Sequence, residues 1–209
     1  MKAKNWPIYT VLSIAVLTMV IPFLWMILTS FKTFEDSTKI PMEILPEVWI
    51  LSNYKDILDV FPIALWFGNS VLAIVISVIG QIFFGSLAAY AFARLRFPGK
   101  EFLFLLILSI MMIPEQIYII PRYNILASVE LTNTRTALWI TKLFSVFAVF
   151  LLRQFILSVP RELDEAAMVD GCSYFRIYAT IIMPILRAPI ISLVILSGLT
   201  TWKDMLWPL

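Results

Sequence analysis

Long uncharged stretches alternate with short charged ones along this chain. The first stretch covers residues 8–31, and no charged residue lies between Lys4 and Lys32. A helix of this length would measure roughly 36 Å, enough to cross the apolar core of a bilayer, which is about 30 Å thick. It is too long for the apolar core of a secretory signal peptide. We therefore expect residues 8–31 to form a retained membrane-spanning helix.

Four further apolar stretches follow, and we interpret each as a membrane span. They cover residues 63–92, 102–120 and 137–152, and a last stretch that begins near Pro189. The main polar segments between the spans are residues 32–62, 122–136 and 153–187. Within the first of these, residues 53–60 are expected to form a short surface helix. The pattern predicts an all-α, polytopic transmembrane helical bundle with five visible spans.

Small residues recur every four positions near the end of the second span. Gly85, Ala89 and Ala93 would lie on one face of a helix. Small side chains let two helices approach closely in a membrane, so this face is expected to be a helix–helix seam. The pair Pro98-Gly99 then predicts a turn.

Composition excludes a soluble enzyme. Hydrophobic residues make up 61% of the chain and charged residues 14%, whereas soluble domains average about 45–50% and 25%. A soluble fold of this size could not cover so much apolar side-chain area. Lipid is therefore the expected solvent for most of this surface.

Few residues suited to catalysis or metal binding are present. The chain has no histidine and one cysteine, which excludes a Ser-His-Asp triad, a zinc-protease helix and an internal disulfide. It also lacks a phosphate-binding loop. We expect no catalytic residue, no metal and no cofactor on this chain, and the net charge of +2 gives no reason to expect nucleic acid.

The distribution of Lys and Arg predicts the orientation. With the N-terminus in the cytoplasm, more of these residues fall in cytoplasmic segments than in external ones. This is the bias known as the positive-inside rule. The N-terminus and residues 153–187 are therefore expected on the cytoplasmic side.

Residues 160–184 predict a helix–turn–helix outside the membrane. Acidic residues crowd the first turns after Pro160, where the helix dipole favours them: Glu162, Asp164 and Glu165. Gly171 then interrupts the helical pattern, and a second apolar-rich helix is expected to stop near Pro184. Apolar side chains beside the turn favour a docking element. A plain amphipathic loop lying on the bilayer is the alternative.

These residues also match a known family. The sequence Glu165-Ala166-Ala167, followed by Asp170-Gly171, Ile182 and Pro184, resembles the EAA loop of ABC-importer permeases. Four further stretches resemble the maltose-transporter (MalG-like) branch of sugar permeases: residues 69–70, 88–94, 131–134 and 202–204. One departure is Lys203, where the family usually shows Asn.

The resemblance implies one permease domain over residues 1–209 in the inner or plasma membrane of a prokaryote. It implies six helices, so the sixth is apparently missing and the chain is expected to be truncated at its C-terminus. It implies a second permease subunit (MalF-like), two ABC ATPase subunits (MalK-like), an extracytoplasmic solute-binding protein, and a sugar or related polyol as substrate. Residues 160–184 would be the ATPase-coupling loop, with these coupling residues: Glu165, Ala166, Ala167, Asp170, Gly171, Tyr174, Phe175 and Pro184.

Two ionisable residues lie within or beside predicted spans. Glu115 falls near the far end of the third span and Lys142 near the start of the fourth. Such residues often mark a transport pathway, so an ion-coupled secondary transporter that uses both is the alternative function. The residues proposed for a substrate cavity are Glu115, Asn69 and Trp202.

Overall fold

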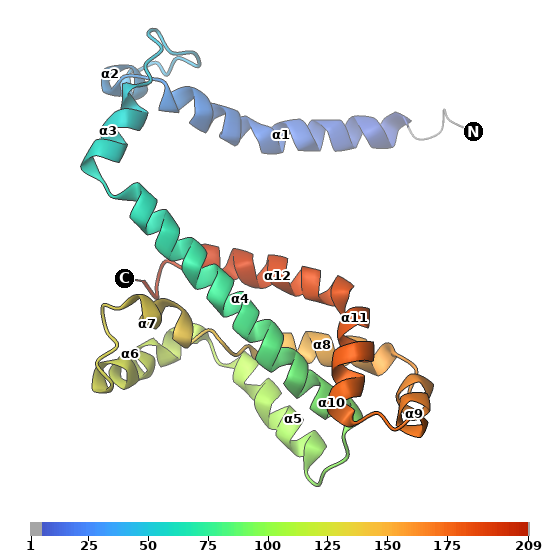
Figure 1. Ribbon diagram of the computed structural model, residues 1–209. Coiled ribbons are helices and arrows are strands. Elements are labelled where there is room, and N and C mark those ends of the chain that lie inside the picture. Colours follow the sequence, from blue (N-terminus) through green and yellow to red (C-terminus); the bar gives the residue numbers. More distant parts are fainter. Residues whose placement is uncertain (1–5, 209) are drawn as a thin grey trace. The chain divides into compact units, whose positions relative to one another are not determined.

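The computed structural model describes residues 6–208, and the regular structure within that range is helical. The chain divides into two compact units, one up to Leu65 and the other from Trp66 onward (Figure 1). Each unit is described by itself below. The all-α architecture predicted from the apolar pattern is confirmed.

The first unit opens with the long helix α1 (Trp6–Ser30). No residue of α1 is buried, and its apolar side chains point in every direction. A helix that is hydrophobic all round requires lipid or a larger core around it. The helix thus matches the predicted first span, and it continues through Pro22.

Residues 31–61, which follow α1, form an ordered segment held together by polar contacts. They contain α2 (Phe34–Thr38) and α3 (Ser52–Val60). Buried Lys32 donates a hydrogen bond to the Glu43 carbonyl, and buried Asp36 accepts one from the Glu47 backbone N–H at 3.1 Å. The surface helix expected at residues 53–60 is confirmed by α3.

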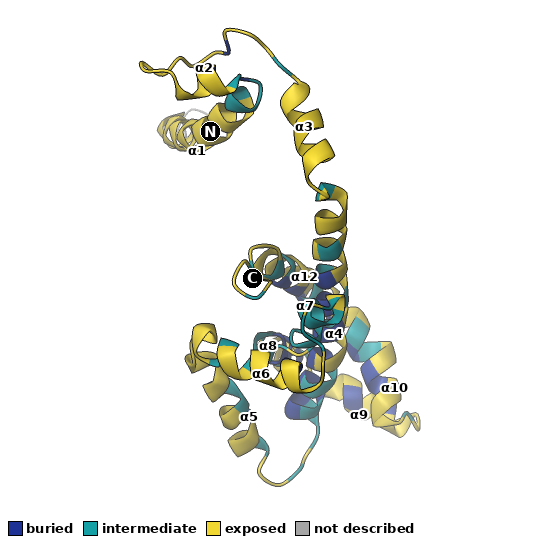
Figure 2. Ribbon diagram, turned by 90° about the vertical axis from the view of Figure 1, so that its left-hand side faces the viewer, coloured by how far each residue is buried: buried dark blue, intermediate teal, exposed yellow. Residues whose placement is uncertain are grey.

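The second unit is built around the longest helix, α4 (Ile63–Arg94), which confirms the second span. The remaining helices of this unit are α5 (Lys100–Ser109), α6 (Ile119–Ser128), α7 (Arg135–Ile140), α8 (Val146–Ser158), α9 (Glu162–Val169), α10 (Tyr174–Ile177), α11 (Met183–Ile185) and α12 (Arg187–Trp202). Buried residues gather where the second half of α4 meets α8 and the α9–α11 region (Figure 2).

The small-residue seam on α4 is confirmed. Ala89 and Ala93 are completely buried. A side chain at Gly85 would place its Cβ 2.9 Å from the Cβ of Ala148 in α8, closer than real Cβ atoms approach. Glycine is therefore required at position 85 for this close helix crossing.

The third predicted span, residues 102–120, is not one helix. Helix α5 gives way to a 3₁₀ turn (Ile110–Met112), and the chain bends by 93° before a second 3₁₀ turn (Glu115–Tyr118) and α6. The cause is Pro114, which has no backbone N–H and forces Ile113 into an extended conformation. The polar connection expected at residues 122–136 is correspondingly wrong, because α6 and the start of α7 occupy much of it.

The fourth predicted span, residues 137–152, is also interrupted. Helix α7 stops at Ile140, and α8 begins only after Ser145, whose hydroxyl accepts a hydrogen bond from the Ala148 N–H at 3.3 Å. Ser145 is therefore an N-cap that starts a new helix. Helix α8 then extends six residues beyond the predicted end, to Ser158.

The last predicted span begins close to where we expected. A π-helical turn (Tyr178–Ile182) joins α10 to α11, so that Tyr174–Ile185 forms one helical column. This column meets α12 at a bend of 73°. The column ends at Ile185, one residue after Pro184, so the second helix stops near Pro184 as expected.

Among residues 6–208, only α1 and α4 are single helices long and apolar enough to cross a bilayer. Two bent pairs, α5 with α6 and the 174–185 column with α12, bring the number to four if each pair crosses once. Helix α8 is apolar but has 13 residues, about 20 Å, which is shorter than a crossing.

Candidate functional site

The two helix interruptions border a large cavity in the second unit. This cavity has a volume of about 1150 Å³ and is lined by the bend at residues 110–118, the α7–α8 connection and the end of α12. Its polar lining includes Gln81, Glu115, Arg122, Lys142, Thr200 and Asp204. A broken helix is tolerated at membrane depth where it lines such a cavity.

Four of the five charged side chains that line this cavity form two ion pairs, and the fifth, Lys203, forms none with the residues that the structure describes. Lys142 forms an ion pair with Asp204, and their side chains are 15% and 17% exposed. The Nη2 atom of Arg122 lies 2.8 Å from Oε1 of Glu115. Glu115 and Lys142 thus line one cavity, but each is paired with a different residue. This arrangement gives no direct support for the Glu115–Lys142 relay considered above.

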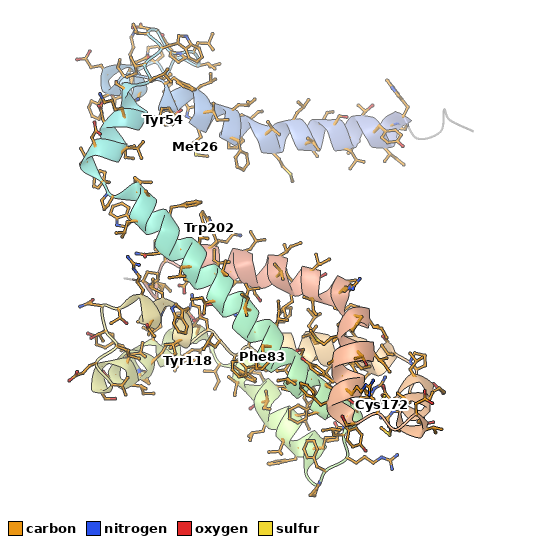
Figure 3. The ribbon with its side chains drawn as sticks, viewed as in Figure 1. Met26, Tyr54, Phe83, Tyr118, Cys172 and Trp202 are labelled. Atoms are coloured by element: carbon orange, nitrogen blue, oxygen red, sulfur yellow. The ribbon has the colours of Figure 1, made fainter. Side chains whose placement is uncertain are left out.

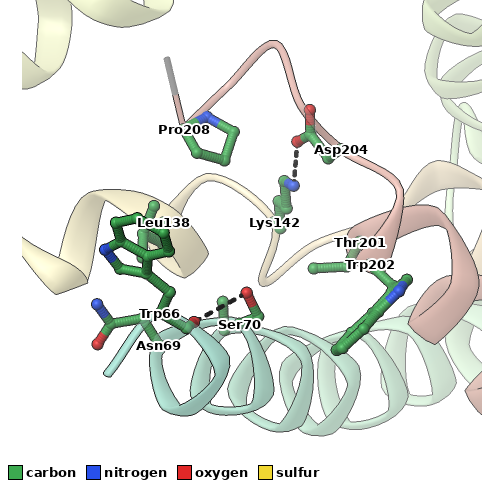
Figure 4. Close-up of a pocket in the computed structure, with 10 residues that line it drawn as sticks. Trp66, Asn69, Ser70, Leu138, Lys142, Thr201, Trp202, Asp204 and Pro208 are labelled. Carbon is green, nitrogen blue, oxygen red and sulfur yellow. Dashed lines mark hydrogen bonds and ion pairs between the residues drawn. The ribbon is translucent and has the colours of Figure 1, made fainter. Parts of the chain in front are cut away.

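The smaller cavity adjoins the first turns of α4 and has a volume of about 340 Å³. Asn69 and Trp202, both predicted as cavity residues, line it together with Trp66 (Figure 4). The ion pair of Lys142 and Asp204 borders this cavity too. The three residues predicted to line a substrate cavity therefore border two different cavities, and the Lys142–Asp204 ion pair borders both.

Two residues of these cavities were missed by the sequence reasoning. Gln81 is 7% exposed, and its side-chain N–H donates to the Lys142 carbonyl at 2.9 Å, which fixes the α7–α8 connection against α4. Asp204 holds Lys142 and also accepts a hydrogen bond from the Trp207 backbone N–H at 3.2 Å. A lone amide in the middle of an apolar span was the available signal for Gln81.

Residues 162–185 form the helix–turn–helix predicted over residues 160–184, and its turn has a defined capping geometry. Gly171 has φ +78°. Its N–H donates to the Met168 carbonyl at 3.0 Å, and the N–H of Cys172 donates to the Ala167 carbonyl at 2.9 Å. This is the Schellman motif, in which a left-handed residue ends a helix. Cys172 lies at this turn (Figure 3), and the Ser173 hydroxyl caps α10.

Comparison with known proteins identifies the family. Residues 81–209 match the family described as the inner membrane component of binding-protein-dependent transport systems. The chain belongs to this family. The resemblance seen in the sequence is confirmed, and the protein is a multi-pass inner membrane permease.

Individual relatives support the same assignment. The arabinooligosaccharide transport permease AraQ of Halalkalibacterium halodurans is 35% identical over 91% of this permease and 69% of its own length. The sn-glycerol-3-phosphate transport permease UgpE of Agrobacterium fabrum is 30% identical over 99% of this permease and 77% of its own length. In fold, the permease resembles a chain of a bacterial ABC transporter that imports the acidic polysaccharide alginate, with a TM-score of 0.81, 19% identity, and coverage of 98% and 74% of the two chains.

The predicted coupling residues of the permease separate into two groups. Ala167 is buried against the core. The others are exposed: Glu165, Ala166, Asp170, Gly171, Tyr174, Phe175 and Pro184. Phe175 is 68% exposed, and Val169, which the sequence reasoning did not select, is 87% exposed. The helix–turn–helix therefore presents an acidic and apolar surface that the permease itself does not cover.

A buried ion pair joins this segment to α4. Nε of Arg94, the last residue of α4, lies 2.6 Å from Oδ2 of Asp164 in α9, and the two side chains are 4% and 7% exposed. The Arg94 Nη2 also donates to the Val159 carbonyl at 2.8 Å. Burial raises the pKa of the Asp164 carboxyl above its ordinary value, and the Arg94 guanidinium opposes that rise. We had assigned Asp164 only to the helix dipole.

The pair was not predictable from local sequence. Arg94 and Asp164 are 70 positions apart, and each has an ordinary local explanation, a basic residue at a helix end and an acidic residue in a first turn. Among the described residues, no three His, Cys, Asp or Glu side chains gather in a group that could hold a metal ion.

Proposed function

We propose that this permease forms half of the membrane pathway of an ATP-driven importer for a sugar or related polyol. In this proposal an extracytoplasmic solute-binding protein delivers the solute, and a second permease subunit forms the other half of the pathway. The family description and the names of the relatives support the proposal, since those proteins transport arabinooligosaccharides and sn-glycerol-3-phosphate.

The chemistry of the smaller cavity favours an uncharged, hydroxyl-rich solute. Its two charged residues, Lys142 and Asp204, form an ion pair and neutralise each other. Trp66 and Trp202 supply aromatic surface, and Asn69 supplies an amide that can exchange hydrogen bonds with hydroxyl groups. This combination of aromatic and amide groups beside neutralised charges is the observation that supports a sugar.

Coupling to cytoplasmic ATPase subunits is assigned to residues 160–184. The exposed apolar side chains Val169 and Phe175 flank a turn that carries the acidic residue Asp170, and the exposed acid Glu165 lies on α9 before it. Exposed apolar surface rimmed by polar residues is typical of a protein–protein interface. ATP-driven movement of the partner would shift the permease between inward-facing and outward-facing states, a two-state equilibrium biased by nucleotide.

The decisive experiment measures ATP hydrolysis by the reconstituted complex with and without loaded binding protein. Glu165→Lys reverses a charge on the docking surface, and Gly171→Val strains the turn. Both variants should assemble and lose stimulation by the binding protein. Glu130→Lys and Gly99→Val are the matched controls, because Gly99 shares the positive φ of +76° but lies outside the segment. Stimulation equal to wild type in both test variants would overturn the coupling role.

The proposal also requires the N-terminus and residues 160–184 to be cytoplasmic. A cysteine introduced at Glu43 should react with an impermeant thiol reagent in intact cells. Native Cys172 should react only with a permeant reagent. Labelling of Cys172 from outside would reverse the orientation.

Discharge of the membrane potential separates this function from an ion-coupled transporter. At constant ATP, uptake should continue when the potential is collapsed, and it should stop when ATP is depleted. The opposite result would favour a relay through Glu115 and Lys142.

A further inference from the structure

Helix α9 makes few contacts that fix its position against the rest of the permease. It has eight residues, and the residue before it, Arg161, makes no side-chain capping hydrogen bond. Its buried residues are Asp164 and Ala167. Ala167 supplies only a methyl group to the core, so the buried ion pair between Asp164 and Arg94, a charge contact rather than a hydrogen bond, is the polar contact that holds this helix.

The partner of Asp164 lies on α4, which reaches both cavities, as α12 also does. Asn69 of α4 lines the smaller cavity, Gln81 lines the larger one, and Arg94 is the last residue of the same uninterrupted helix. The distance along the axis from position 69 to position 94 is about 37 Å. A continuous helix is a rigid element over that length and can carry a displacement between its ends.

Arg94 is suited to such a joint because a guanidinium can bond two acceptors in fixed directions. It holds the Asp164 carboxylate and the Val159 carbonyl, which belong to α9 and to the residues just before it. The second helix of the segment, the 174–185 column, also contacts α4, because the hydroxyl groups of Tyr178 and Ser86 lie 2.8 Å apart. That contact is a neutral hydrogen bond and leaves α9 itself unattached.

We propose that the Arg94–Asp164 ion pair is the joint through which α9 displaces α4 and thereby the cavity lining. Arg94 and Asp164 are positioning residues in this role, and neither touches the solute. The inference rests on the proposed coupling function of residues 160–184. It adds that the force received by the exposed face of α9 passes through one buried charge pair.

The test uses the complete reconstituted importer and measures solute transported per ATP hydrolysed, at equal amounts of assembled complex. Asp164→Asn keeps the shape and removes the charge, and it should lower this ratio at least about fivefold while ATP hydrolysis continues. Asp164→Glu keeps the charge and should restore most of the ratio. Glu130→Gln, which changes an exposed acid outside residues 160–184, is the matched control and should have no effect.

Arg94→Lys is the substitute variant if Asp164→Asn does not assemble. It keeps the buried positive charge but loses the hydrogen bond to the Val159 carbonyl. It should give a ratio of transport to ATP hydrolysis between those of wild type and Asp164→Asn. A structural role alone would reduce transport and ATP hydrolysis in the same proportion. The joint would be overturned if Asp164→Asn left the ratio of transport to ATP hydrolysis unchanged while Glu165→Lys lost stimulation. Where Asp164→Asn does not assemble, an unchanged ratio in Arg94→Lys would have the same meaning. Either result would leave the proposed coupling role of residues 160–184 standing. Wild-type stimulation in Glu165→Lys and Gly171→Val would instead overturn the proposed function itself.

Discussion

Two ion pairs lie along helix α4, and the protein encloses them to different degrees. The pair of Arg94 and Asp164 at its last turn is almost fully buried, whereas the pair of Lys142 and Asp204, beside its first turns, borders both cavities. The buried pair joins two helices and is almost sealed from water. The cavity pair has water or solute as an alternative partner. We infer that the first is a fixed joint and the second an exchangeable contact.

This difference follows from the energetics of buried charge. A charge pair sealed from water cannot lose one member without leaving the other uncompensated. A pair at a cavity wall can be replaced by hydration or by hydroxyl groups. The same residue types can therefore transmit movement at one place and respond to a ligand at another.

The largest effect is expected when the same substitution is made in each pair. Asp164→Asn leaves Arg94 buried without a counter-charge and should lower the free energy of unfolding by roughly 3–5 kcal/mol. Asp204→Asn leaves Lys142 beside a hydrated cavity and should lower it by about 1 kcal/mol. Thermal unfolding of the purified permease in detergent measures both. Equal losses would mean that the two pairs are equally enclosed.

A smaller effect is expected between the two pairs, where α4 meets the α7–α8 connection. A side chain at Gly80 would place its Cβ 2.6 Å from Cδ2 of Leu143 and 3.0 Å from the Leu143 carbonyl oxygen. Gly80→Val should therefore displace the residue next to Lys142 and lower the free energy of unfolding by about 2–3 kcal/mol.

Gly68→Ala is the control for this substitution, because a Cβ at position 68 meets no atom within 4 Å. It should unfold at the wild-type temperature. The Gly80 variant should also weaken solute uptake more than ATP hydrolysis. A Gly80 variant as stable as wild type would show that the connection moves aside at low cost.

The sequence predicted those helices, contacts and turns whose structure depends on one local rule. The long apolar helices α1 and α4, the seam at Gly85 and the turn at Gly171 follow from composition, spacing and the conformational freedom of glycine. In each case the residues involved are close in sequence. The helical fold class follows for the same reason.

The interruptions of the third and fourth spans were missed because apolar composition does not separate one helix from two. Pro114 was a visible signal for the first interruption. The capping role of Ser145 was not visible, because a serine inside an apolar run has several ordinary uses. The ion pairs join residues more than 60 positions apart, and local patterns carry no information about such partners.

The smallest effect is expected at the two turn glycines, which follow Arg94 by five residues and Asp164 by seven residues in sequence. Gly99 and Gly171 have φ values of +76° and +78°, and a Cβ at either position meets no atom within 4 Å. Alanine would therefore suffer only the backbone cost of a left-handed conformation, about 1 kcal/mol. Gly171→Ala should lose no more stability than Gly99→Ala, since the ion pair holds α9 whatever residue ends it.

Asparagine tolerates the left-handed region better than alanine, so Gly171→Asn should recover part of the loss. Thermal unfolding of the three variants beside wild type provides the measurement. In the Asp164→Asn background, the ion pair no longer holds α9. Gly171→Ala should then lower the free energy of unfolding by more than it does in the wild-type background. A double-mutant cycle detects this difference. Strict additivity of the two substitutions would contradict the view that the ion pair, rather than the turn, sets the position of α9.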